Sequence, residues 1–300
     1  MIAAPRLSYA ALISRDIPAA DRLLGEVLGL PRVLLAAGDG MVPVFAAGQA
    51  ALALFAPGDA FVDGASRTGV HHIGLDYGDA SPPAGPVRPG FGGGVRQAIG
   101  EPSGVRTFLA SVLDIPRGGG IVERIDHIGI ASADNRAAIA VFSGALGLPV
   151  ESQQTDIEVE TAIESFTSDK YGVVYHSRPP RPVGGLRVAF LTAGDCELEF
   201  LQNFDPSHGA ALNHGAAGNT KQDQGAITRF IAAYGAGLHH VALKTPDIDA
   251  ALAAMERAGA RMIDRSGRPG SRRARIGFVH PAAFGGVLFH FVERDQADRC

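Results

Sequence analysis

Four apolar segments of this 300-residue chain share one pattern of hydrophobic and polar positions. They are LSYAALISRD from Leu7, VHHIGLDYGD from Val70, IDHIGIASAD from Ile125 and LHHVALKTPD from Leu238. Each has Tyr or His as its third residue and Asp seven residues later. The residues between these two positions alternate or are continuously apolar, which is typical of a buried or half-buried strand. A pattern repeated in this way predicts a chain built from copies of one small unit.

A helix pattern follows three of the four segments. Aspartates that fit N-terminal helix caps precede the helices: Asp16, Asp134 and Asp247. Glycines that fit C-terminal stops end them: Gly29, Gly147 and Gly259. Further apolar runs such as LRVAFL, CELEFLQ and RIGFVHP come next. We therefore expect each unit to be a strand, a helix and about three more strands.

The second copy departs from this pattern. Residues 80–94 read ASPPAGPVRPGFGGG where its helix should begin. Prolines and glycines at this density do not support a regular helix, so we interpret this copy as eroded. Residues 114–121, DIPRGGGI, are a predicted linker. The expected fold class is α+β, with two pairs of units over residues 1–120 and 121–300.

Composition limits the classes of partner. A hydrophobic content of 46% is that of a globular protein with a substantial core, and the net charge of −4 argues against a nucleic-acid partner. No stretch approaches the roughly 18 apolar residues of a membrane span, and the first residues lack the pattern of a signal peptide. The two cysteines imply no disulfide framework. A cytoplasmic protein that acts on small molecules is the expectation, with a homodimer as a candidate assembly.

Strand alternation sorts the polar residues by face. The third and fourth segments carry their large aliphatic residues on the face that a helix must cover, so His127 and His240 point to the concave side. Because neighbours on a strand point to opposite faces, His239 is expected behind His240, in a packing or supporting role. The same alternation places Glu199 and His290 in the cleft. Glu293, three residues after His290, falls on the other face.

Two half-sheets related by pseudo-twofold symmetry would bring four side chains together: His127, Glu199, His240 and His290. Imidazole and carboxylate groups suit one divalent metal such as Mn, Fe, Co, Ni or Zn. A lone strand histidine is usually structural, but two at equivalent repeat positions favour a metal site. The first pair of units has Tyr9 at the first histidine position and Leu54 where the third unit has Glu199. We expect that pair to be free of metal.

The residues of the second half also carry a resemblance. RIDHIGIASAD, CELEFLQ, GLHHVALKTPDIDAAL and IGFVHPAAFGGVLFHFVER resemble the vicinal oxygen chelate (glyoxalase/dioxygenase) superfamily, and within it the methylmalonyl-CoA epimerases. The resemblance covers most of residues 123–294. It implies four tandem βαβββ modules, the second eroded, that form paired open curved sheets around a metal cleft. Carried over by position, it implies the ligands His127, Glu199, His240 and His290.

This chain departs from that family at His290, where the family usually has a glutamate that also moves protons. Either His290 is a ligand, giving a three-histidine, one-glutamate site, or fewer groups hold the metal. Glu199 and His290 are the positions expected to take part in catalysis. Residues 151–185 form an insertion, expected to be a lid or part of the substrate pocket. Residues 265–275 carry five arginines, expected to form a solvated loop or an anion site.

The resemblance implies an enzyme that acts on a small molecule with vicinal oxygens. The leading hypothesis is an epimerase or isomerase that removes a proton next to a carbonyl through a metal-stabilised enediolate. Four modules in two pairs also resemble extradiol and 4-hydroxyphenylpyruvate-type dioxygenases, so an Fe(II)-dependent dioxygenase is the first alternative. A metal-free ligand-binding or resistance protein is the second.

Overall fold

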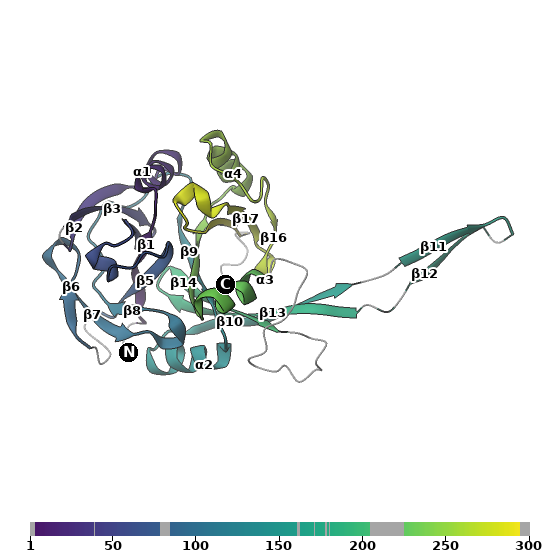
Figure 1. Cartoon of the computed structure of the whole chain (residues 1–300), viewed down its shortest axis with the longest axis horizontal. Coiled ribbons are helices and arrows are strands. Elements are labelled where there is room, and N and C mark those ends of the chain that lie inside the picture. Colours follow the sequence, from purple (N-terminus) through teal and green to yellow (C-terminus); the bar gives the residue numbers. More distant parts are fainter. Residues whose placement is uncertain are drawn as a thin grey trace.

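The first two repeated segments form neighbouring strands of one curled sheet (Figure 1). Its strands are β1 (Arg6–Ile13), β2 (Arg32–Ala37), β3 (Gly40–Ala47), β4 (Ala50–Phe55), β5 (Gly69–Asp76), β6 (Val87–Pro89), β7 (Val95–Gly100) and β8 (Thr107–Leu109). They lie in the order β2-β3-β4-β1-β5-β8-β7-β6. β1 and β5 pair antiparallel, and the last strand of each module returns parallel to its first.

The other two segments form a second sheet with the same order of strands. The strands are β9 (Arg124–Ala131), β10 (Val150–Glu160), β13 (Arg181–Ala193), β14 (Cys196–Phe204), β15 (Gly237–Lys244), β16 (Arg268–Pro269), β17 (Arg275–Val279) and β18 (Phe289–Glu293). Their order is β10-β13-β14-β9-β15-β18-β17-β16, with β9 antiparallel to β15. The repeat of one topology confirms the predicted α+β class of tandem modules. This computed structural model describes residues 4–38, 40–78, 85–160, 163–170, 172–177, 179, 181–204 and 225–294.

Three helices begin at the predicted aspartates. They are α1 (Ile17–Arg22), α2 (Asn135–Ile139) and α4 (Ile248–Arg257), and π-helical segments at Leu23–Val27 and Ala140–Ala145 continue the first two. The carboxylates of Asp16, Asp134 and Asp247 each accept a backbone N–H of the first turn, which confirms them as caps. The predicted C-terminal glycines have φ of 71°, 76° and 82°, a conformation that glycine adopts without strain. A further helix, α3 (Gly225–Tyr234), lies outside the predicted unit.

The described part of the second module has four strands and, between them, 3₁₀ turns instead of the α-helix of the other modules. Among its described residues we find no α-helix, only 3₁₀ turns at Phe91–Gly93 and Pro102–Gly104. Residues 79–84 of the expected eroded stretch lie outside the described ranges. None of the helices in the described part of the chain has the length and apolarity that a bilayer crossing requires.

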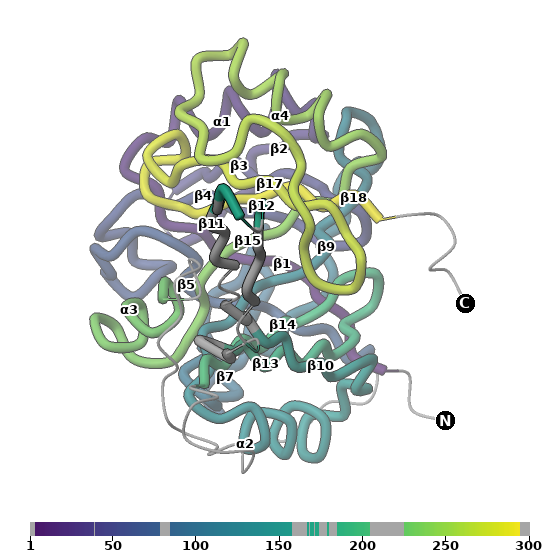
Figure 2. The backbone as a smooth tube through the Cα atoms, turned by 90° about the vertical axis from the view of Figure 1, so that its right-hand side faces the viewer, coloured from purple at the N-terminus to yellow at the C-terminus, as the bar shows by residue number. Residues whose placement is uncertain are grey.

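One apolar core lies between the two sheets and includes residues of both. Leu12 of β1, Ile128 of β9 and Val241 of β15 are buried in it together with Phe142 and Met255 from the helical segments. α1 and α4 lie side by side over this core, and Arg22 donates to the carbonyl of Ala258 at 2.9 Å (Figures 1 and 2). Each fully buried aliphatic side chain stabilises the folded state by about 1.5–3 kcal/mol. The convex faces of both sheets are therefore held against each other.

The insertion at residues 151–185 lengthens two strands and adds a ribbon. β10 and β13 extend past the body of the second sheet, and β11 (Ile163–Ser168) pairs antiparallel with β12 (Gly172–Ser177). Figure 1 shows this ribbon projecting away from the sheets. At the base of the insertion, Asp156 and Ile157 line the cavity described below, and a role of the insertion as a lid or part of a substrate pocket stays a prediction.

The predicted linker is packed against the first module. The Ile121 N–H donates to the carbonyl of Leu28 at 3.0 Å. Gly120 has φ of 80°, and a Cβ there would collide with the Leu28 carbonyl oxygen. Gly118 has φ of 88°, but a Cβ there would point into open space, with no neighbouring atom within 4 Å. A side chain at either position would strain the backbone, but only at Gly120 would it also collide with a neighbouring atom. Comparing the two positions therefore separates the two destabilising effects.

We predict that Gly120→Ala lowers the free energy of unfolding by more than Gly118→Ala does. A left-handed conformation costs a non-glycine residue about 1–2 kcal/mol at either position. The collision with the Leu28 carbonyl adds to this cost at Gly120 only. Urea denaturation of both variants measures the difference, and equal losses would show that the linker does not dock on the first module.

Candidate metal centre

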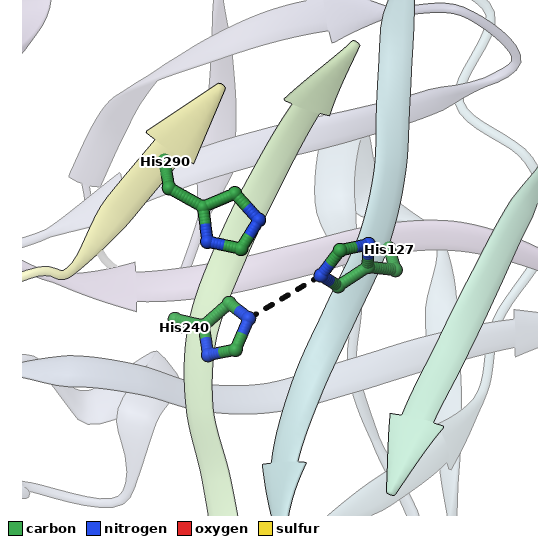
Figure 3. Close-up of side chains that lie close together, drawn as sticks. All are labelled: His127, His240 and His290. Carbon is green, nitrogen blue, oxygen red and sulfur yellow. Dashed lines mark hydrogen bonds between the residues drawn. The ribbon is translucent and has the colours of Figure 1, made fainter. Parts of the chain in front are cut away.

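The four residues expected in the cleft lie on four adjacent strands at the centre of the second sheet. Glu199 is on β14, His127 on β9, His240 on β15 and His290 on β18, which are neighbours in that order. All four are buried, with exposed fractions of 3–5%. Figure 3 shows the three imidazole rings turned toward one another. The tertiary fold therefore brings together residues that are up to 163 positions apart (290 minus 127).

The ligating atoms are within a few ångströms of one another. His127 Nε2 lies 3.1 Å from Glu199 Oε2 and 3.4 Å from His240 Nε2, and His240 Nε2 lies 3.6 Å from the same carboxylate oxygen. One ring nitrogen from each of the three histidines lies within 4.8 Å of the other two. Several side chains from different strands thus converge on one point.

The surroundings of His290 show whether these four side chains fit a metal ion. Both of its ring nitrogens are buried, and neither has a hydrogen-bond partner among the described residues. A buried polar atom left without a partner costs about 1–3 kcal/mol. A divalent ion at the point of convergence would give His290 the partner it lacks. Three imidazoles and one carboxylate are a donor set that such an ion accepts.

The charges of the cluster also fit a cation. Burial lowers the pKa of His290 well below its usual range, and His240 and His127 lower it further, so its ring is neutral. Burial acts to raise the pKa of Glu199, but His127 outweighs this effect and holds the carboxyl ionised. Burial acts to lower the pKa of His127, but Glu199 and Asp126 outweigh it and raise the pKa to about 9. Glu199 thus attracts a positive charge, held as a proton on His127, and a divalent cation bound by the cluster would take the place of that proton.

β-Bulges change the face of the residues that precede two of the ligand histidines, His127 and His240. The pairing of β9 with β15 passes from Leu238 to His240 and omits His239, and on the other strand it omits Asp126. A bulge re-aims a side chain at the point where it interrupts the ladder. His239 Nδ1 therefore lies 2.9 Å from His240 Nδ1, and both rings line the same cavity. The prediction that His239 and His240 point to opposite faces was wrong for this reason.

Asp126 and Arg294 belong to the centre although the sequence pattern did not single them out. Asp126 Oδ1 lies 2.9 Å from His127 Nδ1, so a proton on Nδ1 is held there and Nε2 is left to face Glu199. Arg294 donates to both oxygens of Asp126, at 2.6 Å and 3.1 Å. The only sequence signal was an aspartate next to a candidate ligand, and regular alternation assigns such a residue to the opposite face.

A glycine makes room for one of the rings. A Cβ at Gly129 of β9 would collide with the ring of His240, which lies directly over it. In the first sheet, Gly74 makes the same room for the ring of Tyr9. The glycine in HIGI and HIGL is thus required by the close approach of an aromatic ring from the neighbouring strand.

Glu293 lies on the face opposite His290. Its carboxylate accepts the N–H of Ile248, the first residue of α4, at 2.8 Å, and also pairs with Arg275 at 3.3 Å. His290 lines the cavity and Glu293 does not. The strand from Phe289 to Glu293 pairs with β17 without a register shift, so no bulge brings Glu293 inward.

The four residues line a cavity of about 410 Å³. Most of its wall is apolar, formed by Leu186, Phe190, Leu201, Ile227, Ile263, Ile276, Phe278, Leu288 and Val292 among others. Its polar lining outside the cluster includes Asp156, His239, Arg268, Ser271 and Arg294. A concave, largely apolar site with a few convergent polar groups is typical of a small-molecule site.

The first sheet has the same frame without the ligands. His72 stands in the position of His240, but Arg96 donates to its Nε2 at 2.7 Å and Phe108 takes the position of His290. Register also corrects one residue: Ala53, not Leu54, is the equivalent of Glu199, since Tyr9 pairs with Ala51 as His127 pairs with Glu197. Leu54 belongs to the core between the sheets. Within the described ranges, the one group of three ligating side chains is in the second sheet.

Most arginines of residues 265–275 are paired with carboxylates. Arg272 contacts Glu151 and Glu197 and lies 3.6 Å from the centre of the Phe190 ring. Arg268 pairs with Asp264 at 3.2 Å and also lines the cavity. The loop is therefore an ion-paired rim, and Arg268 is the arginine of this stretch that reaches the cavity wall.

Similarity to known proteins identifies the class of protein. Residues 126–278 match the model of the Glyoxalase/Bleomycin resistance protein/Dioxygenase superfamily, and the chain belongs to this superfamily. The ethylmalonyl-CoA/methylmalonyl-CoA epimerase of Cereibacter sphaeroides is 27% identical over 179 residues, which cover 59% of this chain and 99% of that protein. The uncharacterized protein YqjC of Bacillus subtilis is 25% identical over 172 residues, 57% of this chain and 93% of that protein.

A solved structure shares the fold over nearly the whole chain. A mutant of 4-hydroxymandelate synthase from Streptomyces coelicolor superposes with a TM-score of 0.61, covering 97% of this chain and 93% of the other, at 14% sequence identity. The likeness shows that the layout of both sheets occurs as a unit in another protein.

We predict that His240→Ala lowers the affinity for Co²⁺ by more than 100-fold, since loss of a residue that only supports a ligand already costs roughly 10–100-fold. His72→Ala, the equivalent change in the first sheet, should leave the affinity unchanged because Arg96 already occupies that position. Calorimetric titration of both variants measures the effect. An equal loss of Co²⁺ affinity in the two variants would show that the assignment of the metal site to the second sheet is wrong.

We further predict that His290→Ala weakens Co²⁺ binding by roughly tenfold or more, whereas His290→Glu retains it, because a carboxylate is also a ligand for this ion. Glu293→Ala should leave Co²⁺ binding unchanged and lower the free energy of unfolding by about 1 kcal/mol, since α4 loses an acceptor at its first turn. The opposite result, with metal lost in Glu293→Ala alone, would reverse the assignment.

Proposed function

We propose that the chain is a divalent-metal-dependent enzyme that removes a proton next to a carbonyl group, as an epimerase or isomerase does. The observation that carries the proposal is His290, whose two buried ring nitrogens lack partners beside His127, His240 and Glu199. These four residues would hold one ion of the Mn, Fe, Co, Ni or Zn group. When bound, such an ion would polarise a carbonyl and stabilise the negative charge that develops on its oxygen.

The residues around the centre support this chemistry. Asp126 fixes the ring of His127, and the packing of His240 over Gly129 fixes the second ring, so both are held before a substrate arrives. Most of the cavity wall is apolar, and electrostatic interactions are stronger beside apolar groups than in bulk water. A substrate with two vicinal oxygens would present both to one side of the cluster.

The proton must leave to a base within reach of the substrate. Among the described residues that line the cavity, the carboxylates are Glu199 and Asp156. Glu199 is held ionised by His127, which suits a ligand and makes it a weak base. His290 is neutral and could move a proton only if it were released from the ion. We therefore propose Glu199 and His290 first as ligands, with their part in proton transfer secondary.

The relatives suggest a first substrate to test. Among them is the ethylmalonyl-CoA/methylmalonyl-CoA epimerase, which shares 27% of residues over 179 positions with this chain. Acyl thioesters with an acidic α-carbon carry the carbonyl that the proposed chemistry needs. We also propose that residues 1–120 form the metal-free pair of modules and residues 121–300 the metal-binding pair. A homodimer and a cytoplasmic location stay predictions from the sequence.

An Fe(II)-dependent dioxygenase is the second candidate. His127, His240 and Glu199 form a set of two histidines and one carboxylate, which is the ligand type of many non-haem iron oxygenases. His290 is an additional ligand candidate and would leave fewer open positions on the ion. This difference favours the enolising reaction.

We predict that the Co²⁺-loaded protein exchanges the α-proton of methylmalonyl-CoA with deuterium from D₂O without consuming oxygen. Mass spectrometry follows the exchange, and an oxygen electrode checks the second part. His240→Ala should reduce the exchange rate by about 100-fold or more, since a metal ligand is lost. Oxygen uptake that matches product formation, seen with the Fe²⁺-loaded protein on a 2-oxo acid, would contradict the proposal and favour the dioxygenase.

A further inference from the structure

We infer that His239 is a hydrogen-bond donor to the substrate, and that its proton is placed there by His240. The inference rests on the proposed function, because it assigns His240 Nε2 to a metal. It concerns a residue that regular strand alternation would place away from the cleft. His239 would be a group that touches the substrate, and His240 the group that fixes which of its nitrogens carries the proton.

The position of His239 follows from the bulge in β15. The pairing with β9 omits His239, and its ring lines the same cavity as the ring of His240. Its Nδ1 lies 2.9 Å from His240 Nδ1, and its ring meets that of Phe230 edge to face, with centres 4.8 Å apart. Within the described part of the chain, His239 Nε2 makes no hydrogen bond.

The number of protons decides which nitrogen of His239 is the donor. A neutral imidazole carries one N–H, and a hydrogen bond between two ring nitrogens needs an unprotonated acceptor, so only one of the two Nδ1 atoms carries a proton. His240 Nε2 points at Glu199 Oε2 and His127 Nε2, the point where the ion would bind. A ligating nitrogen carries no proton, so His240 must carry its proton on Nδ1 and donate it to His239 Nδ1. His239 then carries its own proton on Nε2.

Asp126 and His239, the two residues that the β9–β15 ladder omits, therefore differ in whether they can donate a proton to a ligand. Asp126 also contacts the Nδ1 of its histidine, but it has no proton to present, and Arg294 occupies both of its oxygens. His239 can present an N–H to a ligand in the cavity. Donors aimed at an oxygen that gains negative charge stabilise it most where the surroundings are apolar, as the wall of this cavity is. His239 is thus a neutral donor beside the cluster.

The first test locates the protons directly. The full chain, loaded with Zn²⁺ and labelled with ¹⁵N in its histidines, is studied by NMR through the couplings of ring nitrogens to ring protons. We expect a protonated Nε2 and an unprotonated Nδ1 for His239, and a protonated Nδ1 for His240. A proton on Nδ1 of His239 would overturn the inference.

The second test measures ligand binding with oxalate, a dianion with vicinal oxygens. At saturating Co²⁺, His239→Phe should raise the Kd for oxalate about tenfold, because one charge-assisted hydrogen bond is lost. His239→Gln, whose amide can accept and donate, should retain most of the affinity. His71→Phe is the matched control: His71 contacts His72 Nδ1 at 2.7 Å through the same bulge in the first sheet, and its loss should leave oxalate binding unchanged.

Each outcome decides between the two claims. An unchanged Kd for oxalate in Co²⁺-loaded His239→Phe would overturn the inference and leave the proposed function intact, with His239 as a support for His240 only. Failure of the unmodified protein to bind Co²⁺ would contradict the proposed function itself. A similar loss in His71→Phe and His239→Phe would show that the effect is structural and would also overturn the inference.

Discussion

The apolar core between the two sheets is the constraint on which the rest of the structure depends. Each central strand commits one face to this core, with residues such as Leu12, Ile128 and Val241. Because side chains alternate along a strand, everything on the other face is turned to the concave side of its own sheet. A shift of one residue in register would exchange the two sets, so burial of the core fixes the register. Burial of the core therefore sets the direction of the His127 and His240 side chains, although neither histidine belongs to the core.

The two sheets share one order of strands, but different side chains occupy their concave faces. In the first sheet, the buried Arg96 guanidinium lies over the Phe61 ring at 3.7 Å and donates to His72 Nε2, so the concave side is filled by protein. In the second sheet, the rings of His127, His240 and His290 converge with Glu199 beside an open cavity. In the first sheet the buried imidazole of His72 accepts a hydrogen bond from the Arg96 guanidinium. In the second sheet the three imidazoles surround a position suited to a metal cation. The duplicated fold therefore has one filled half and one half available to a ligand.

Bulges add a second level of control over the same positions. The ladder omits His71 in the first sheet and Asp126 and His239 in the second, each directly before the histidine that faces inward. Each omitted residue contacts Nδ1 of its neighbour, so the orientations of His72, His127 and His240 are fixed from within their own strands. A regular strand could not do this, because it would turn the preceding residue into the core. The interruption costs ladder hydrogen bonds and supplies the support that a ligand histidine needs.

The sequence by itself determined the repeated modules, the capping aspartates and the break in the helix pattern of the second module. It also determined that His127, Glu199, His240 and His290 face the cleft, because all of these depend on local pattern and on period-two alternation. Only the tertiary structure decided which residues lie beside them. The bulges reversed the face of His239 and brought Asp126 inward, and register replaced Leu54 by Ala53. Whether a strand bulges, and which residue pairs across it, depends on contacts between segments far apart in the chain. Those contacts are absent from any local pattern of hydrophobic and polar residues, which is why they had to be seen in the fold.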